Sequence, residues 1–590
     1  MRLSLRLRIK AGAWLGGLLC VLLVCGAAQG APAGPGLGYA TYLGGGDWDD
    51  VLDLAVDASG NVWVVGNTIS EKLPFAPGAL LQKGRRNGFL AKFSLSGKLL
   101  FIKTFPVGSD SQDDYSEWGV NSIALTESGE AWIAGATDME NFPIVGEAFQ
   151  KTFAGGDGDA FLAKFSSSGE LIYSTFLGGK NWDSIHDITT DGHGGVWVTG
   201  TTQSENFPVT EDAYQKKYGA PSSSEPADDA FLARFSASGE RVYSTFLGGE
   251  KHEGGDSVAM DSAGNVWVAG GTYSRNFPVT SNAFQSKFGG EEDVFVAKFS
   301  AVNQCVFVTY LGSRKIDSAK HIATDVSGNA WIIGYWDSQY SPVMTMNLIA
   351  KIDPSGQIRR QPLPDFFTWP RHNVNSLVVG RTGEVWITGN CFDVANEDAL
   401  YPDILYSDIY VAKFSESGAP FYQTKLGAGE HAWTRGIAIG PDGDIWLTGE
   451  TTSNKFPVTK DAIQRKYGGR NDGSAYRDGF LLKIKAAQTA RDRPIVFLPG
   501  IMGSELYADY PPLGDDTDKG HLVWLPVAPF SSIISHGAAL ADYPLYVRAP
   551  EDQHKSRYKE YGAGIGRLPG LLGGELLRPA KKRLLAFLSG

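Results

Sequence analysis

A tryptophan flanked by two glycines recurs seven times along this chain of 590 residues. Each copy reads Gly-x-x-Trp-x-x-Gly, and the copies follow one another at an average spacing of about 64 residues. The seven tryptophans are Trp63, Trp132, Trp197, Trp267, Trp331, Trp386 and Trp446. A repeat of this length predicts an array of similar units, each of which buries its apolar surface against its neighbours.

One unit is enough to predict a β-hairpin. In residues 54–66, two apolar runs flank the sequence Asp-Ala-Ser-Gly-Asn, which is typical of a tight turn with positive φ at Gly60. The run Val62–Val65 is β-branched and aromatic, so it suits a strand that is buried on both faces.

Two further strands are predicted in each unit. A third strand has seven copies: Phe89–Phe93, Phe161–Phe165, Phe231–Phe235, Phe295–Phe299, Leu348–Ile352, Tyr410–Phe414 and Phe480–Ile484. A fourth strand is predicted at Tyr173–Gly179 and Tyr243–Gly249, with weaker copies at Phe307–Ser313 and Phe421–Gly427. The Asn-Phe-Pro-Val elements at Asn206–Val209 and Asn276–Val279 are expected to be loops or edges because of their proline.

Four strands in each of seven units predict a mainly β fold, a seven-bladed β-propeller over residues 38–485. Tyr39–Gly45 is a fourth-strand motif that has no third strand before it, and Phe480–Ile484 is a third strand that has no fourth strand after it. The N-terminal strand is therefore expected to complete the last blade and close the ring. An open β-solenoid is the alternative architecture.

The repeat, with its Leu-Gly-Gly, Asp-x-x-Gly-Asn-x-Trp-x-x-Gly and Asn-Phe-Pro-Val-Thr elements, resembles the bacterial β-propeller repeat called SBBP. That family more often has Tyr at the Trp position. The resemblance implies a propeller located outside the cytoplasm and no defined chemistry.

Candidate binding residues lie in the propeller loops. An acid precedes the turn aspartate by eight residues in four units, at Asp49, Asp183, Glu253 and Asp317, and such acids are weak candidates for a cation site. The alternative is that each carboxylate caps a loop of its own blade. Trp48, Trp118, Trp182 and Trp433 are candidates for stacking on a glycan or an apolar ligand, or else they pack between blades. No cofactor is expected, and the spacing of the histidines does not indicate a zinc site.

The N-terminus predicts export. Residues 1–30 combine a basic start, an apolar run at 11–25 and small residues before Ala31, as in a secretory signal peptide. A membrane anchor and a lipoprotein signal at Cys25 are the alternatives. The expected location is the periplasm, the cell surface or the extracellular space. The net charge of −12 argues against nucleic acid as a partner. Only Cys305 and Cys391 follow the signal, and whether they pair is left open.

The composition changes after Lys485. We expect a linker at 486–492 and a second domain from residue 493 to 590. The string Pro-Ile-Val-Phe-Leu-Pro-Gly-Ile-Met-Gly-Ser-Glu-Leu at 494–506 resembles the opening strand and loop of lecithin:cholesterol acyltransferase-like α/β-hydrolases. The resemblance implies that the backbone N–H of Ile501 belongs to an oxyanion hole and that Met502 and Gly503 shape this loop. The sequence departs from the family because the Gly-x-Ser-x-Gly nucleophile motif and the Ser-acid-His order are absent.

Three functions follow as hypotheses. The first is an exported propeller fused to the start of an acyl hydrolase or O-acyltransferase that acts on lipid esters, with the nucleophile absent from this chain. The second is a non-enzymatic propeller that binds a surface protein or a glycan. The third, suggested only by the repeated acids, is that the propeller itself is a sugar-acting enzyme.

Overall fold

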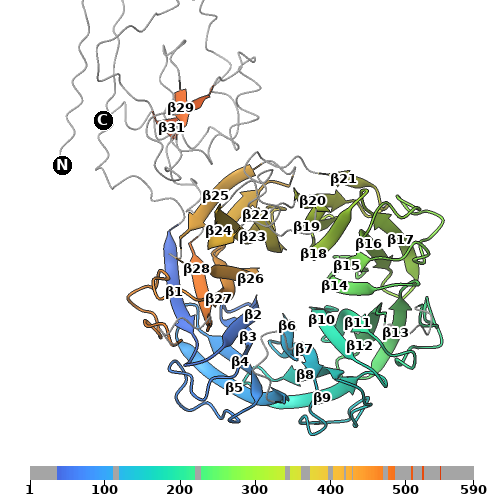
Figure 1. The fold of residues 1–590 in the computed structure, drawn as a ribbon, viewed down its shortest axis with the longest axis horizontal. Helices are drawn as coiled ribbons and strands as arrows, with labels where there is room; N and C mark the ends of the chain where they lie inside the picture. The colour runs from blue at the N-terminus through green and yellow to red at the C-terminus, as the bar shows by residue number, and fades with distance from the viewer. Residues whose placement is uncertain are drawn as a thin grey trace, which may run out of the picture. The chain divides into compact units, whose positions relative to one another are not determined.

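The computed structural model describes residues 36–109, 118–219, 227–338, 346–360, 372–395, 403–416, 420–427, 430–469, 476–485, 506–508, 521–523 and 545–546. The chain divides into two compact units, Met1–Ala487 and Gln488–Gly590. The first unit contains seven four-stranded antiparallel sheets, which Figure 1 shows as blades around a central axis. The predicted seven-bladed propeller is confirmed.

The strands of each blade run from the axis outwards. Blade 1 is β2 (Asp49–Val56), β3 (Val62–Thr68), β4 (Arg86–Phe93) and β5 (Leu99–Gly108); blade 2 is β6 (Gly119–Leu125), β7 (Ala131–Thr137), β8 (Asp159–Phe165) and β9 (Leu171–Leu177); blade 3 is β10 (Asp183–Thr190), β11 (Val196–Thr202), β12 (Asp229–Phe235) and β13 (Arg241–Leu247); blade 4 is β14 (Glu253–Met260), β15 (Val266–Thr272), β16 (Asp293–Phe299) and β17 (Cys305–Leu311). Blade 5 is β18 (Ile316–Thr324), β19 (Ala330–Ser338), β20 (Met346–Ile352) and β21 (Ile358–Arg360); blade 6 is β22 (His372–Val379), β23 (Val385–Ala395), β24 (Asp403–Phe414) and β25 (Pro420–Leu426); blade 7 is β26 (Ala432–Ile439), β27 (Ile445–Thr451), β28 (Asp478–Ile484) and β1 (Leu37–Leu43).

The N-terminal strand closes the ring as predicted. β1 pairs antiparallel with β28, from Leu43 opposite Gly479 to Leu37 opposite Ile484. Tyr42 on β1 is buried, and its hydroxyl donates to the Ser453 carbonyl at 2.8 Å. Residues from the two ends of the propeller sequence therefore share one sheet, and the closing pair covers an edge that would otherwise be exposed.

Blades 1 to 6 have two kinds of connection between their strands, and blade 7 differs in that no turn joins β28 to β1. Tight turns join the first strand to the second and the third to the fourth, as at residues 57–61, where Gly60 has a φ of +80° and its N–H donates to the Asp57 carbonyl. Longer loops, such as 69–85, join the second strand to the third, and segments such as 44–48 and 178–182 join one blade to the next. Because the strands alternate in direction, the tight turns lie on one face, and the loops and the connections between blades lie on the other, which we call the long-loop face.

The seven tryptophans form the contacts between blades. Each packs into the apolar core shared with the following blade; Trp132, for example, packs with Ile185 and Val196 of blade 3, and Trp446 of blade 7 packs with Val51 and Val62 of blade 1. The ring is therefore held by one repeated, buried aromatic anchor at every junction.

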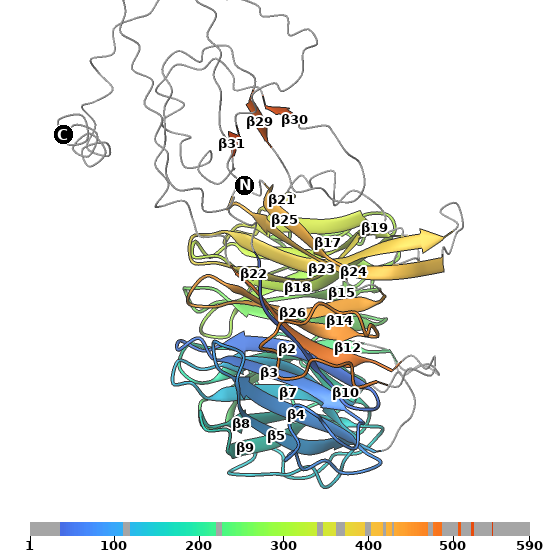
Figure 2. The ribbon, with the colours of Figure 1, turned by 90° about the vertical axis from the view of Figure 1, so that its left-hand side faces the viewer.

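Some strands depart from the predicted pattern. The outer strand β5 of blade 1 and the three-residue β21 of blade 5 had no recognisable motif in the sequence. In blade 6, β23 and β24 are longer than their counterparts, and Figure 2 shows them extending beyond the neighbouring strands. Cys305 and Cys391, whose pairing the sequence left open, are not joined by a disulfide bond.

The second unit is described only at three short strands, β29 (Leu506–Ala508), β30 (His521–Val523) and β31 (Leu545–Tyr546), which pair antiparallel with β29 in the centre. The predicted signal segment 1–30 lies outside the described residues. Within the described ranges, no helix has the length and hydropathy needed to cross a membrane.

Candidate functional site

The four predicted acids cap loops on the long-loop face. Each is the first or second residue of the inner strand of its blade and is buried. Asp49 accepts hydrogen bonds from the Gly45 N–H at 2.6 Å, the Thr68 hydroxyl at 2.5 Å and the Ser70 hydroxyl at 2.9 Å. Burial raises the pKa of Asp49 well above its usual range. The carboxylate is therefore used to hold the connection between blades 7 and 1.

The other three acids repeat this arrangement. The N–H donors are Gly179 for Asp183 at 2.7 Å, Gly249 for Glu253 at 2.6 Å and Ser313 for Asp317 at 2.5 Å. Burial raises the pKa of Asp183 to about 7 and that of Glu253 to about 7. No group of three or more His, Cys, Asp or Glu side chains is placed to hold a metal ion within the described ranges. The geometry is that of loop caps, which was the alternative to a cation site.

A second set of buried acids was not singled out from the sequence. Asp159 begins the third strand of blade 2 and accepts hydrogen bonds from the Ala154 N–H at 2.7 Å and the Gln150 amide at 3.0 Å. Gly178 separates this carboxylate from that of Asp183, since a Cβ at Gly178 would lie 2.7 Å from an oxygen of each. The first position of the Leu-Gly-Gly motif must therefore be glycine, because any side chain there would clash with the two carboxyl groups. In five of the seven blades the signal in the sequence is an aspartate two residues before the predicted third strand, whereas blade 1 has Asn87 and blade 5 has Met346 at this position.

Two of the four candidate tryptophans meet where the ring closes. The guanidinium carbon of Arg477 lies 4.2 Å from the centroid of the Trp48 ring and 5.0 Å from that of Trp433. His431 stacks on Trp433, with ring centroids 5.2 Å apart and an interplanar angle of 11°. The four side chains therefore form a layered cluster of aromatic rings and one cation at the junction of blades 7 and 1.

A buried carboxylate fixes the cations of this cluster. Glu450 is 2% exposed, and its Oε1 accepts hydrogen bonds from Arg435 at 2.8 Å and from Arg477 at 3.1 Å. We call the six side chains of Trp48, His431, Trp433, Arg435, Glu450 and Arg477 the closure cluster. All but Glu450 keep part of their surface exposed. The cluster is a partly exposed and rigidly held group, of the composition that protein interfaces favour.

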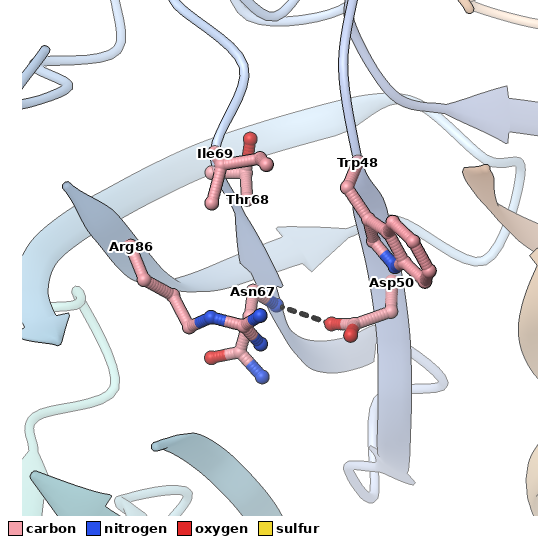
Figure 3. Close-up of a pocket in the computed structure, with 6 residues that line it drawn as sticks. All are labelled: Trp48, Asp50, Asn67, Thr68, Ile69 and Arg86. Carbon is pink, nitrogen blue, oxygen red and sulfur yellow. Dashed lines mark hydrogen bonds between the residues drawn. The ribbon is translucent and has the colours of Figure 1, made fainter. Parts of the chain in front are cut away.

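A shallow depression adjoins the closure cluster (Figure 3). It has about 140 Å³ of empty space and is lined by Trp48, Asp50, Asn67, Thr68, Ile69 and Arg86. The Asn67 N–H donates to Asp50 at 2.9 Å, and the Asn67 amide is fixed by the backbone of Val120 in blade 2. Enclosed sites for small molecules usually measure about 300–1,000 Å³. The depression is therefore a surface feature and not an enclosed ligand site.

The remaining predicted residues are dispersed. Trp118 and Trp182 are partly buried, and Trp118 lies against Gly158, where an added Cβ would clash with its ring. They do not join the closure cluster. Ile501, Met502 and Gly503 lie outside the described residues.

No protein-family model matches the chain. The chain is 23% identical over 262 residues to the regulatory protein FlaEY of Caulobacter vibrioides, and this match covers 44% of the chain and 24% of that protein. The chain therefore spans about a quarter of the length of this relative.

Similar solved structures include YCF48 bound to D1 peptide, with 13% identity, a TM-score of 0.33 and coverage of 78% of this chain and 99% of that one. Sqt1 from Chaetomium thermophilum has 11% identity, a TM-score of 0.38 and coverage of 76% and 99%. A glucose dehydrogenase has 13% identity, a TM-score of 0.31 and the same coverage.

Proposed function

We propose that this chain is an exported binding protein whose propeller recognises a macromolecular partner on its long-loop face. The observation that carries the proposal is the closure cluster, in which Trp48, Arg477 and Trp433 are stacked and remain partly exposed. Trp and Arg are the residues most enriched among those that dominate binding energy at protein interfaces.

The rigidity of the cluster supports the same proposal. Arg477 is held by two rings and by Glu450, so little side-chain entropy remains to be lost when a partner binds. Loops carried by a rigid scaffold are also the usual location of binding residues. The partner is a surface protein or a glycan of the cell envelope.

A second candidate function concerns the C-terminal segment. The string at 494–506 favours the start of a lecithin:cholesterol acyltransferase-like acyl hydrolase that acts on lipid esters, with the N–H of Ile501 as an oxyanion donor and with Met502 and Gly503 shaping its loop. The propeller would then bring the catalytic unit to its lipid-ester substrate. The test is the coding sequence downstream of Gly590: an open frame that encodes Gly-x-Ser-x-Gly, then an acid and a His, supports this function, and a stop codon contradicts it.

Export is tested by fractionation of the producing cell. We expect to find the chain outside the cytoplasm, with a mature N-terminus at or near Ala31. A full-length chain that stays in the cytoplasm would overturn this part of the proposal.

The binding function is tested with purified chain and isolated envelopes of the producing cell. Sedimentation should show saturable binding that Trp48→Ala and Trp433→Ala each weaken about tenfold or more, in the range of residues that dominate interfaces. Trp182→Ala is the matched control and should bind as the wild type does. Equal binding by all variants would contradict the proposal, and pretreatment of envelopes with protease or periodate separates a protein partner from a glycan.

A further inference from the structure

A serine hydroxyl in blade 2 lies between two carboxylates from the neighbouring blades. Ser122 Oγ, on β6, is 2.8 Å from Asp53 Oδ2 on β2 and 3.0 Å from Asp187 Oδ1 on β10. Ser122 is buried and both aspartates are partly buried. The three residues occupy the same position in their blades, directly after the bulge of the innermost strand.

The two short distances from Ser122 Oγ to the aspartates need two hydrogens, one in each oxygen–oxygen contact. Ser122 supplies one, and two ionised aspartates supply none. A serine hydroxyl carries one hydrogen, so it can donate to only one of the two carboxylates at a time. The other oxygen–oxygen contact is favourable only when the aspartate supplies the hydrogen and the serine oxygen accepts it. One of the two aspartates must therefore be protonated for both contacts to be hydrogen bonds.

The other donors identify which aspartate holds the proton. Besides Ser122, Asp187 accepts hydrogen bonds from three donors, the Ile188 N–H at 2.8 Å, the Ser257 hydroxyl at 2.6 Å and the Val258 N–H at 2.8 Å. Among the described residues, the donors to Asp53 besides Ser122 are two, the N–H groups of Leu54 at 2.8 Å and Ile123 at 2.9 Å. Because Asp187 accepts more hydrogen bonds, it is the better site for a negative charge, and we assign the proton to Asp53.

We propose that Asp53, Ser122 and Asp187 form a carboxyl–hydroxyl–carboxylate chain that links blades 1, 2 and 3 while Asp53 is protonated. Asp53 donates its proton to Ser122 Oγ, and Ser122 donates its own to Asp187. When Asp53 ionises, its proton leaves to solvent, the contact with Ser122 loses its hydrogen, and the link between blades 1 and 2 weakens.

The charged neighbours do not neutralise the pair. On β10 and β18, burial lowers the pKa of His186 and of His321, which favours neutral rings. Lys320 on β18 is exposed, and Arg435 on β26 is bound by Glu450. Asp50, on the same strand as Asp53, adds a further acid.

The environment of Asp53 agrees with this assignment. Burial, followed by the nearby Asp187, raises the pKa of Asp53 to about 7, although hydrogen bonds from the Ile123 and Leu54 N–H groups oppose the shift. Because the unfolded chain releases this proton near pH 4, the stabilising contribution of the protonated form declines as pH rises from about 4 to about 7. The link is therefore sensitive to pH in a range that an exported protein meets.

The test is infrared spectroscopy of the full chain, which separates protonated from ionised carboxyl groups by their C=O stretch. At pH 6, the Asp53→Asn variant should lack one protonated-carboxyl band that the wild type has, and in the wild type that band should disappear with a midpoint near pH 7. Unchanged protonated-carboxyl bands in Asp53→Asn would overturn the proposal.

Two further variants keep the test decisive if Asp53→Asn does not fold. Ser122→Ala removes the acceptor of the Asp53 proton and should shift the frequency of the same band. Asp187→Asn allows Ser122 to donate to Asp53 and should move the disappearance of the band to lower pH. Bands that respond to neither substitution would contradict the chain of hydrogen bonds.

Discussion

The Lys298 ammonium lies 4.4 Å from the centroid of the Trp267 ring and 3.5 Å from a carboxylate oxygen of Asp261. Lys298 and Trp267 are directly opposite each other on neighbouring strands. The same cross-strand pair, with Lys or Arg over the repeated Trp, occurs in all seven blades at 4.4–5.3 Å. The Trp that anchors each blade junction is thus covered by a cation from its own blade.

Replacing this lysine tests the stability that the pair contributes. Lys298→Met keeps the apolar stem but removes the charge over Trp267 and beside Asp261. We expect a loss of about 1–2 kcal/mol in the free energy of unfolding, measured in urea by tryptophan fluorescence. Lys298→Arg is the control, because blade 3 carries Arg234 at this position. An unchanged Lys298→Met variant would refute the contribution.

Ring closure by the N-terminal strand predicts a strong effect of a short deletion. Removing residues 37–43 exposes the edge of β28 and the apolar surface that Tyr42 covers. We expect loss of a cooperative unfolding transition and rapid proteolysis of blade 7. Removing residues 31–36 alone should leave both properties unchanged. A stable, cooperatively unfolding chain after the 37–43 deletion would show that closure is dispensable.

The buried loop caps predict that the stability of the propeller falls as pH rises. Burial raises the pKa of Asp183 to about 7, whereas an unfolded aspartate ionises near 3.9. Between these values the folded chain binds more protons than the unfolded chain, so the free energy of unfolding decreases with rising pH.

The Asp183→Asn variant should therefore show a shallower decrease between pH 4 and 7. An asparagine can still accept from the Gly179 N–H and exchange hydrogen bonds with the hydroxyls of Thr202 and Ser204. The exposed Asp157→Asn change is the matched control. Urea titrations at several pH values give the slopes, and identical slopes for wild type and Asp183→Asn would contradict the assignment.

Glu450 is predicted to be the structural centre of the closure cluster. Glu450→Ala leaves Arg435 and Arg477 without their shared carboxylate. Because both arginines are partly exposed, we expect a loss of about 1–3 kcal/mol, less than for a fully buried ion pair. Glu450→Gln retains one acceptor and should lose less. A Glu450→Ala variant as stable as the wild type would indicate that the two rings alone position Arg477.

Local chemistry made much of the fold predictable. The glycine three residues before each repeated Trp has positive φ in the structure, and the repeated Trp is buried in every blade. Both features were predictable because they depend on a few neighbouring residues. The Lys or Arg opposite each Trp was equally visible in the sequence, since it recurs in the third strand of every blade. Its position over the Trp ring could not be predicted, because that depends on the register between the two strands.

The candidate site was predictable only in part. Trp48 and Trp433 were identified, but their meeting at Arg477 requires the first and last blades to be adjacent, a consequence of ring closure. The placement of Ser122 between Asp53 and Asp187 likewise depends on the packing of three blades. No local sequence pattern encodes such contacts.

The most direct test of the binding function is amide hydrogen exchange of the mature chain, free and bound to isolated envelopes. We expect slower exchange on binding in residues 44–48, 69–86, 430–433 and 476–479 around the closure cluster, and no change at the tight turns of the opposite face, such as 57–61. Protection at those turns, with no change around Trp48 and Trp433, would contradict the proposed binding function of the long-loop face.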